Sequence, residues 1–177
     1  HKIGSYTVTG EYGYHEIAQG SEFIEDGGSI TINASSDDAM NSLDSFNIVG
    51  VLVTITHEDT ETVNGPLCDV AEPPQDDTVE ATISHANLSA GEADTNSFDF
   101  QLNWHNSSLV NSNVSNMTKA DIESMLDGGG IGFGMHDLVI GVTVQNGGGL
   151  GCNSNDDGQD VSYTIELVSL DYSVNPV

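Results

Sequence analysis

The residues best suited to chemistry lie in a Gly/Asn-rich stretch near the C-terminus, where side chains that carry oxygen alternate along the chain. The candidate ligands are Asn153, Asn155, Asp157 and Asp160. The first three come at alternate positions before Gly158, as the first ligands of a twelve-residue calcium-binding loop do. The twelfth position is Thr164, where such a loop needs a bidentate Glu, so an Asx-rich turn without metal is the alternative. Calcium is the one cofactor that this pattern suggests.

A second candidate site begins at His1, whose amino group and imidazole could hold one metal ion together. With a second histidine, either His85 or His105, this set resembles the copper brace of lytic polysaccharide monooxygenases, which are secreted β-sandwich enzymes. That resemblance implies a copper-dependent oxidation. Against it, aromatic residues make up only 6% of the chain, and the motifs of serine hydrolases, zinc proteases and phosphate-binding loops do not occur. We therefore predict a protein that is not an enzyme, with the copper site as an alternative.

The charge balance excludes two classes of partner. The chain has 28 acidic residues against Lys2 and Lys119, which gives a formal net charge of -26. Nucleic acids and anionic membrane surfaces are excluded because both are bound through basic side chains. No apolar run approaches the roughly 20 residues of a membrane-spanning helix. With 177 residues, the chain is expected to form one domain.

Three features predict an exported protein. The chain begins with His and not Met, which we interpret as the start of a mature chain whose export signal has been removed. Cys68 and Cys152 are predicted to form a disulfide, with two free thiols as the alternative. Sequons for N-glycosylation predict an extracellular surface glycoprotein. The sequon asparagines are Asn33, Asn87, Asn106, Asn113 and Asn116.

Alternating apolar residues separated by turn residues predict the elements that must position these side chains. Strands are predicted at 5–17, 29–34, 46–57, 79–85, 98–105, 137–145 and 161–174. In the last strand the apolar positions change phase, which predicts a bulge or bend near Leu167–Ser169. Thr118 is the predicted N-cap of one short helix that the glycines after Asp127 terminate. The pattern predicts an all-β fold, an antiparallel β-sandwich of jelly-roll type with one short helix.

The first strand, "SYTVTGEYGYHEI", raises the question of which sheet receives it. Tyr6, Val8, Tyr12 and Tyr14 share one face, with Gly10 between them. The strand could pair within its own chain, as a first strand usually does. It could also complete the sheet of a neighbouring molecule, in which case head-to-tail repetition would build a fibre.

Two segments resemble known exported proteins. The stretch "GIGFGMHDLVIGVTVQNGGGLGCNSNDDGQDVSYTIELVSLDYSV" is similar to the closing strands of secreted jelly-roll modules on surface proteins of marine microbes. The N-terminal strand resembles the donor strand of exported pilins, including archaeal filament subunits. These resemblances imply an accessory or structural module. The terminal position of the strand, the absence of catalytic or ligand motifs and a surface suited only to solubility and glycosylation favour pairing with a neighbouring molecule. We therefore predict a donor strand at residues 1–17, one sandwich domain at residues 18–177, and a cell-surface structural protein that polymerises into a filament by strand donation.

The alternative function is a secreted jelly-roll module that binds calcium or carbohydrate. Its site would be formed by exposed aromatic residues and the loop 153–160, and its partners would be surface glycans.

Overall fold

The computed structural model describes residues 2–59, 62–64, 77–143, 153–155 and 158–177. Every strand predicted from alternation and the helix after Thr118 are confirmed, with shifted ends. The strands are β1 (Ile3–Glu25), β2 (Ser29–Ser35), β3 (Ile48–Asp59), β4 (Thr62–Asn64), β5 (Thr78–His85), β6 (Leu88–Asp94), β7 (Phe98–Asn103), β8 (Ser112–Thr118), β9 (Met135–Thr143), β10 (Asn153–Asn155) and β11 (Gly158–Pro176). The helices are α1 (Asp37–Ser42), the 3₁₀ helix η1 (Ser107–Leu109) and α2 (Lys119–Leu126).

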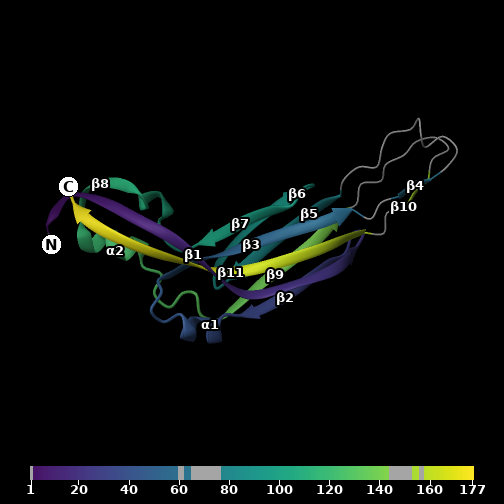
Figure 1. Ribbon diagram of the computed structural model, residues 1–177, viewed down its shortest axis with the longest axis horizontal. Coiled ribbons are helices and arrows are strands. Elements are labelled where there is room, and N and C mark those ends of the chain that lie inside the picture. The colour runs from purple at the N-terminus through teal and green to yellow at the C-terminus, as the bar shows by residue number, and fades with distance from the viewer. Residues whose placement is uncertain (1, 60–61, 65–76, 144–152, 156–157) are drawn as a thin grey trace.

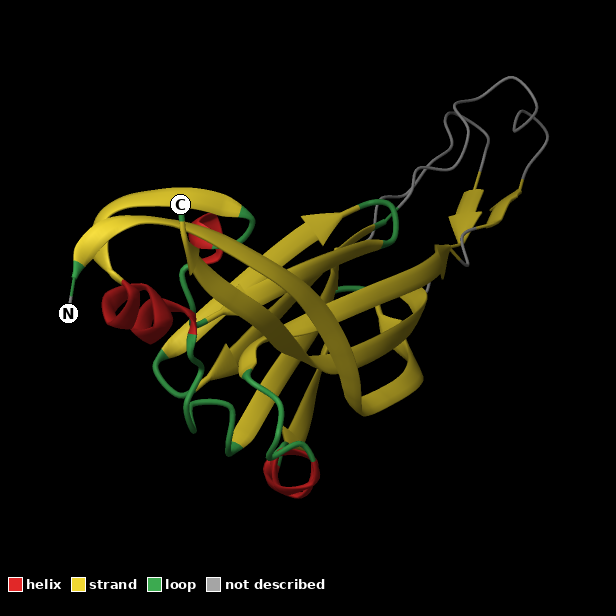
Figure 2. Ribbon diagram, turned by 60° about the vertical axis from the view of Figure 1, so that its left-hand side comes forward, coloured by secondary structure: helices red, strands yellow, loops and turns green. Residues whose placement is uncertain are grey.

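The strands form an antiparallel sandwich with jelly-roll connectivity (Figures 1 and 2). One sheet has the order β7-β3-β11-β1-β8 and the other the order β2-β9-β5-β6, while β10 and β4 make a small separate pair. Without the added edge strand β8, each sheet contains four strands, and the chain crosses between the sheets as in the two Greek keys of a jelly roll. The predicted fold class is confirmed by this strand order.

The facing sides of the two sheets hold the main core. Val51, Val53 and Ile55 of β3 pack there against Ile83 of β5 and Ile140 of β9, and all five are fully buried. These side chains come from the alternating positions that the sequence pattern assigned to one face. At 25–30 cal/mol per Å² of apolar surface, burial of these side chains is what stabilises the sandwich.

β1 and β11 run on beyond the sandwich as a two-stranded ribbon and build a second core. We call this part, residues 3–14 of β1 and 168–176 of β11 with β8, η1 and α2, the outer lobe (Figure 1). Ile122 and Leu126 of α2 pack on Val8 and Leu170 of the ribbon. Both ends of the described chain lie in the outer lobe (Figure 1).

The predicted irregularity near Leu167–Ser169 is confirmed. The pairing of β11 with β3 shifts between Val168 and Ser169, and the extra residue lies in β3, where Val49 has no partner in the register. The bulge turns Val49 into the outer-lobe core, although Val51, two positions on, lies in the main core.

In the structure of the single chain, the first strand pairs within its own chain, and strand donation to a neighbour stays a prediction. Tyr6 to Glu25 of β1 pair with β11, and Ile3 to Val8 also pair with β8 on the other side. The predicted division after residue 17 coincides with a register shift between Glu16 and Ala18, and β1 passes through it without a break. Because the residues meant for donation already have strand partners, a donor role would require them to leave their own sheet.

Six of the described elements were not predicted from the sequence pattern, namely α1, η1, β4, β6, β8 and β10. Only Met40 of α1 is buried, so this helix shows no apolar stripe in the sequence. β6 and β8 are mostly exposed, so they show no alternation. No helix of the described residues has the length and apolarity that crossing a membrane requires.

Candidate functional site

The candidate site lies on the β1/β11 ribbon, at the point where the ribbon leaves the sandwich and enters the outer lobe. At the end of the sandwich, α1 and Trp104 close a small cluster of Met40, Ile48 and Leu167. Beyond Leu167 the same face of β1 and β11 continues without a sheet above it. The loop after α1 therefore faces an open stretch of the ribbon.

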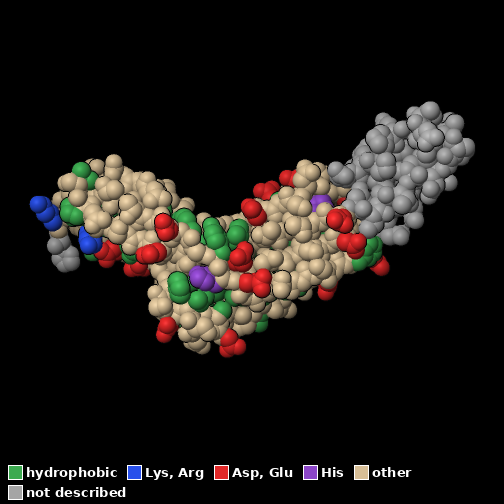
Figure 3. Space-filling view, viewed as in Figure 1, with side chains coloured by type: hydrophobic (Ala, Val, Ile, Leu, Met, Phe, Trp, Pro, Cys, Tyr) green, Lys and Arg blue, Asp and Glu red, His purple; other side chains and the backbone are tan. Residues whose placement is uncertain are grey.

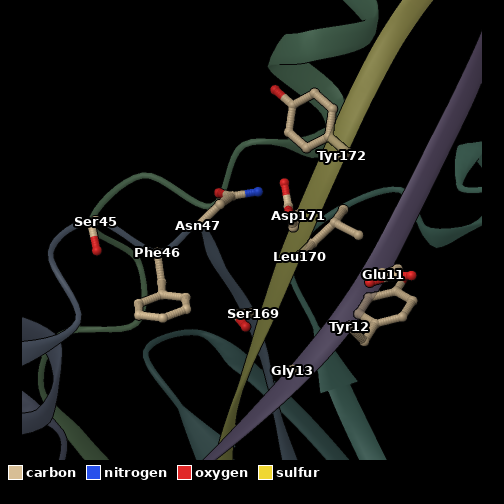
Figure 4. Close-up of a pocket in the computed structure, with 10 residues that line it drawn as sticks. All are labelled: Glu11, Tyr12, Gly13, Ser45, Phe46, Asn47, Ser169, Leu170, Asp171 and Tyr172. Carbon is tan, nitrogen blue, oxygen red and sulfur yellow. The ribbon is translucent and has the colours of Figure 1, made fainter.

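This stretch forms a hollow of about 510 Å³, which we call the groove (Figure 4). That volume is within the range of small-molecule sites. One side is the loop after α1, and the other side is the β1/β11 ribbon. The lining residues are Glu11, Tyr12, Gly13, Ser45, Phe46, Asn47, Ser169, Leu170, Asp171 and Tyr172. Figure 3 shows a histidine beside hydrophobic and acidic side chains near the middle of the described part of the molecule.

Small residues form the floor of the groove. Gly13 of β1 lies directly opposite Ser169 of β11. A Cβ atom at Gly13 would lie 2.7 Å from the Ser169 hydroxyl, so a larger residue would fill the space above it. The Ser169 Oγ is hydrogen-bonded to His15 Nε2 at 2.9 Å. The floor is thus shallow, polar and held by a contact between the two strands.

Phe46 forms the aromatic wall. Half of its surface is exposed, and its ring contacts the ring of His15 with centroids 4.9 Å apart at 58°. The contact fixes one face of the ring against the protein and leaves the remainder to solvent. An aromatic ring held in this way is a preformed apolar surface for a ligand.

Several polar side chains of the groove are already engaged. The Asn47 amide donates to the Leu126 carbonyl and accepts from the Gly128 amide, both at 2.8 Å. The Tyr172 hydroxyl donates to the Asp127 carboxylate, and burial together with this bond raises the pKa of Tyr172. These bonds tie the groove walls to the end of α2 and leave the Asn47 amide and the Tyr172 hydroxyl already engaged.

The carboxylates of Glu11 and Asp171 remain open to a ligand. They lie opposite each other on neighbouring strands and are both exposed. Exposed Ser45 adds a hydroxyl on the other side. A carboxylate only accepts hydrogen bonds, so the groove calls for a ligand that donates them.

A second hollow of about 350 Å³ continues the groove along the ribbon, and we call it the extension. It shares Glu11, Asp171 and Tyr172 with the groove. Beyond them, the hydroxyls of Thr9 and Ser173 are hydrogen-bonded across the strands at 2.7 Å. The two hollows together follow β1 and β11 from Phe46 into the outer lobe, which gives the site the form of a channel for an extended ligand.

The aromatic residues predicted on the first strand divide between two roles. Tyr6 and Val8 are buried in the outer-lobe core, whereas Tyr12 and Tyr14 are exposed. The Tyr12 hydroxyl contacts His105 Nε2 at 2.8 Å, and burial lowers the pKa of His105. Gly10 does make room for a close neighbour, but the neighbouring side chain is that of Leu170 in the same chain.

Among the described residues, no group of three or more His, Cys, Asp or Glu could hold a metal ion. Asn153 and Asn155 belong to strand β10, Asp157 lies outside the described residues, and Asp160 is exposed on β11 opposite Glu58. The calcium site stays a prediction.

Of the two histidines that could bind copper together with His1, His85 is not available. His1 lies outside the described residues. The two ring nitrogens of His85 contact the carbonyl oxygens of Met135 and Ile131 at 2.9 and 2.5 Å. His85 therefore has no ring nitrogen free for a metal. His105 has Nε2 in contact with Tyr12, as described above.

The predicted modification sites have different outcomes. Cys68 and Cys152 lie outside the described residues, so the disulfide stays a prediction. The five sequon asparagines are all exposed, as glycosylation requires, and they lie on β2, in the β5–β6 turn, before η1 and on β8. They are Asn33, Asn87, Asn106, Asn113 and Asn116.

Comparisons with known proteins found no family and only distant structural similarities. No protein-family model and no curated protein matches the chain. A structure of turnip yellow mosaic virus is similar, with 10% identity, a TM-score of 0.30 and coverage of 94% of both chains. A full particle of Israeli acute paralysis virus has 10% identity and a TM-score of 0.37, over 93% of this chain and 74% of the other. TmCBM61 in complex with beta-1,4-galactotriose has 8% identity and a TM-score of 0.28, over 95% and 88%.

Proposed function

We propose that this protein is an extracellular, non-catalytic module that binds an extended carbohydrate chain in the groove and its extension. The observation that carries the proposal is the half-exposed ring of Phe46 beside a groove whose open polar groups are carboxylates and a hydroxyl. A sugar ring has apolar C–H faces and an edge of hydroxyl groups. The faces can pack on an aromatic ring, and the hydroxyls can donate to Glu11 and Asp171.

The shape of the site supports a chain of sugars over a single one. The extension shares three residues with the groove and prolongs it along the ribbon. Its Thr9 and Ser173 hydroxyls both donate and accept hydrogen bonds, as sugar hydroxyls do. The walls are preformed, because Asn47 and Tyr172 are fixed to α2, and a preformed site loses little entropy on binding.

The test is calorimetric titration with a panel of neutral oligosaccharides and polysaccharides. Replacement of Phe46 by Ala should weaken the association of the bound glycan about tenfold, equivalent to about 1.4 kcal/mol. The matched control is Phe133→Ala, because Phe133 is exposed to a similar extent, 44% against 50%, and does not line the groove. Thermal unfolding of both variants checks that each is folded.

The proposal is wrong if the folded wild-type protein binds no neutral glycan of the panel. It is equally wrong if Phe133→Ala weakens binding as much as Phe46→Ala does.

Assembly into a homopolymer is a second candidate that one observation favours. From Glu11 to Glu25, the edge of β1 opposite β11 has no strand partner among the described residues. A neighbouring chain could add a strand there while β1 stays in its own sheet. Glu11, Glu16 and Glu22 along this strand oppose pairing with a second acidic copy. Sedimentation at low and high salt tests the idea, since screening of these charges should promote assembly if the edge is used.

A further inference from the structure

Resting on the proposed function, we infer that the groove selects uncharged glycans and rejects those that carry carboxylate or sulfate groups. The preferred charge of the ligand follows from the charged side chains that a bound glycan would contact. Glu11 and Asp171 lie opposite each other on the open face of the ribbon and line both the groove and the extension. A ligand that fills either hollow therefore lies against both carboxylates.

Hydrogen-bonding capacity points in the same direction. The two carboxylates accept hydrogen bonds and cannot donate them. Hydroxyl groups of a neutral sugar can satisfy them as donors. The ionised group of a uronate or a sulfate ester also only accepts hydrogen bonds. Its oxygens therefore cannot form hydrogen bonds with the Glu11 and Asp171 carboxylates and are repelled by them.

The positive charges that could offset this repulsion lie elsewhere. The chain contains no arginine, and its two lysines are Lys2 and Lys119. Lys119 forms an ion pair with Glu123 at 3.8 Å. Lys2 precedes β1, nine positions before Glu11, which is about 30 Å along an extended strand at about 3.3 Å per residue. Neither lysine lines the groove or the extension.

The charge of the whole molecule reinforces the local effect. With a formal net charge of -26, the protein repels anions before they reach the groove. This general repulsion is screened by salt beyond about 10 Å at 0.1 M, whereas repulsion by carboxylates in contact with the ligand is screened less. The two contributions can therefore be separated by experiment.

The experiment compares a neutral oligosaccharide from the panel with its uronate counterpart of equal length and linkage. Titrations are run in EDTA, so that no divalent cation bridges the anions, and at pH 8, where histidine side chains are neutral. At 50 mM salt the wild-type protein should bind the neutral chain at least tenfold more tightly.

Paired variants then locate the selectivity. Glu11→Gln with Asp171→Asn should reduce the ratio of neutral to anionic affinity about tenfold. The matched control is Glu92→Gln with Asp99→Asn, which changes net charge equally at two exposed carboxylates outside both hollows and should leave the ratio nearly unchanged.

The possible failures are distinguishable. If the wild-type protein binds the neutral and the uronate chain equally, the selectivity is absent while the proposed function stands. If the control pair lowers the ratio as much as the groove pair, Glu11 and Asp171 do not determine it. If neither chain binds, the proposed function itself is overturned, and this inference with it.

Discussion

Leu167 and Val168 are consecutive residues of β11, and both are completely buried, on opposite faces of the same sheet. Leu167 packs at the end of the sandwich with Met40 and Ile48. Val168 packs in the outer-lobe core beneath α2. Between Leu167 and Val168, the packing of the ribbon therefore changes from the end of the sandwich on one face to the outer-lobe core on the other face. The groove lies on the first of these faces, beyond the end of the sandwich.

Truncation of either residue should destabilise the protein, because each fills a different core. Leu167→Ala should lower the free energy of unfolding by about 2–5 kcal/mol. Val168→Ala should lower it by about 2 kcal/mol, from the loss of two methyl groups. Urea unfolding measures both, with Val139→Ala as the control at an apolar position that is 42% exposed. A change at Val168 no larger than the control would show that the outer lobe has no core of its own.

Buried His136 should make stability depend on pH. Its ring stacks on that of His85 with centroids 3.7 Å apart, and burial lowers the pKa of His136 to about 4. In the unfolded chain a histidine has a pKa of about 6.5, so the unfolded state takes up the proton first as the pH falls. The neutral His136 therefore contributes stability above pH 6.5 that is lost between pH 6.5 and 4, up to about 3 kcal/mol.

The contribution of His136 is isolated by comparison with His136→Leu. The carboxylates titrate in both proteins, so only the difference between their unfolding free energies reports on this histidine. Trp104 lies 5.5 and 6.5 Å from the His85 and His136 rings, and its fluorescence gives a local signal. Equal pH dependence in the two proteins between pH 7 and 4.5 would contradict the assignment.

Substitution by alanine should have very different effects on stability at Gly128 and at Gly13. A Cβ atom at Gly128 would lie 1.6 Å from the Ile48 carbonyl oxygen, which is fixed in the backbone. Gly128→Ala should therefore cost about 3 kcal/mol or more. At Gly13 the nearest atom is the Ser169 hydroxyl, which can rotate. Gly13→Ala should cost less than about 1 kcal/mol and should weaken glycan binding by raising the floor. Thermal unfolding and titration measure the two effects, and the reverse order of stability would refute this explanation.

The strands that could be predicted from the sequence are those with one buried face and one exposed face. Alternation located β3, β5, β7, β9 and β11, because one face of each packs into a core while the other faces outward. The phase change in β11 predicted a bulge or bend near Leu167–Ser169, and the structure explains it by the burial of Leu167 and Val168 on opposite faces. β6 and β8 carried no such signal, because most of their side chains are exposed.

The groove was not predictable from local spacing. Glu11 and Asp171 face each other across β1 and β11 although 160 positions separate them in the chain, and Phe46 comes from a third segment. Exposed aromatic residues were assigned to the site of the alternative binding module, but Tyr12 itself was interpreted as part of a donated strand. Only the register of β1 on β11 places these residues together.

The central claim, that a neutral glycan lies between Phe46 and the ribbon, is tested most directly by nuclear magnetic resonance. Backbone amide signals are followed while a neutral oligosaccharide is added. The largest shifts should fall on residues 11–13, 45–47 and 169–172, with smaller shifts at Thr9 and Ser173 along the extension. Shifts confined to the exposed face of β2, β9 and β5, or saturable binding without any shift at Phe46, would contradict the account.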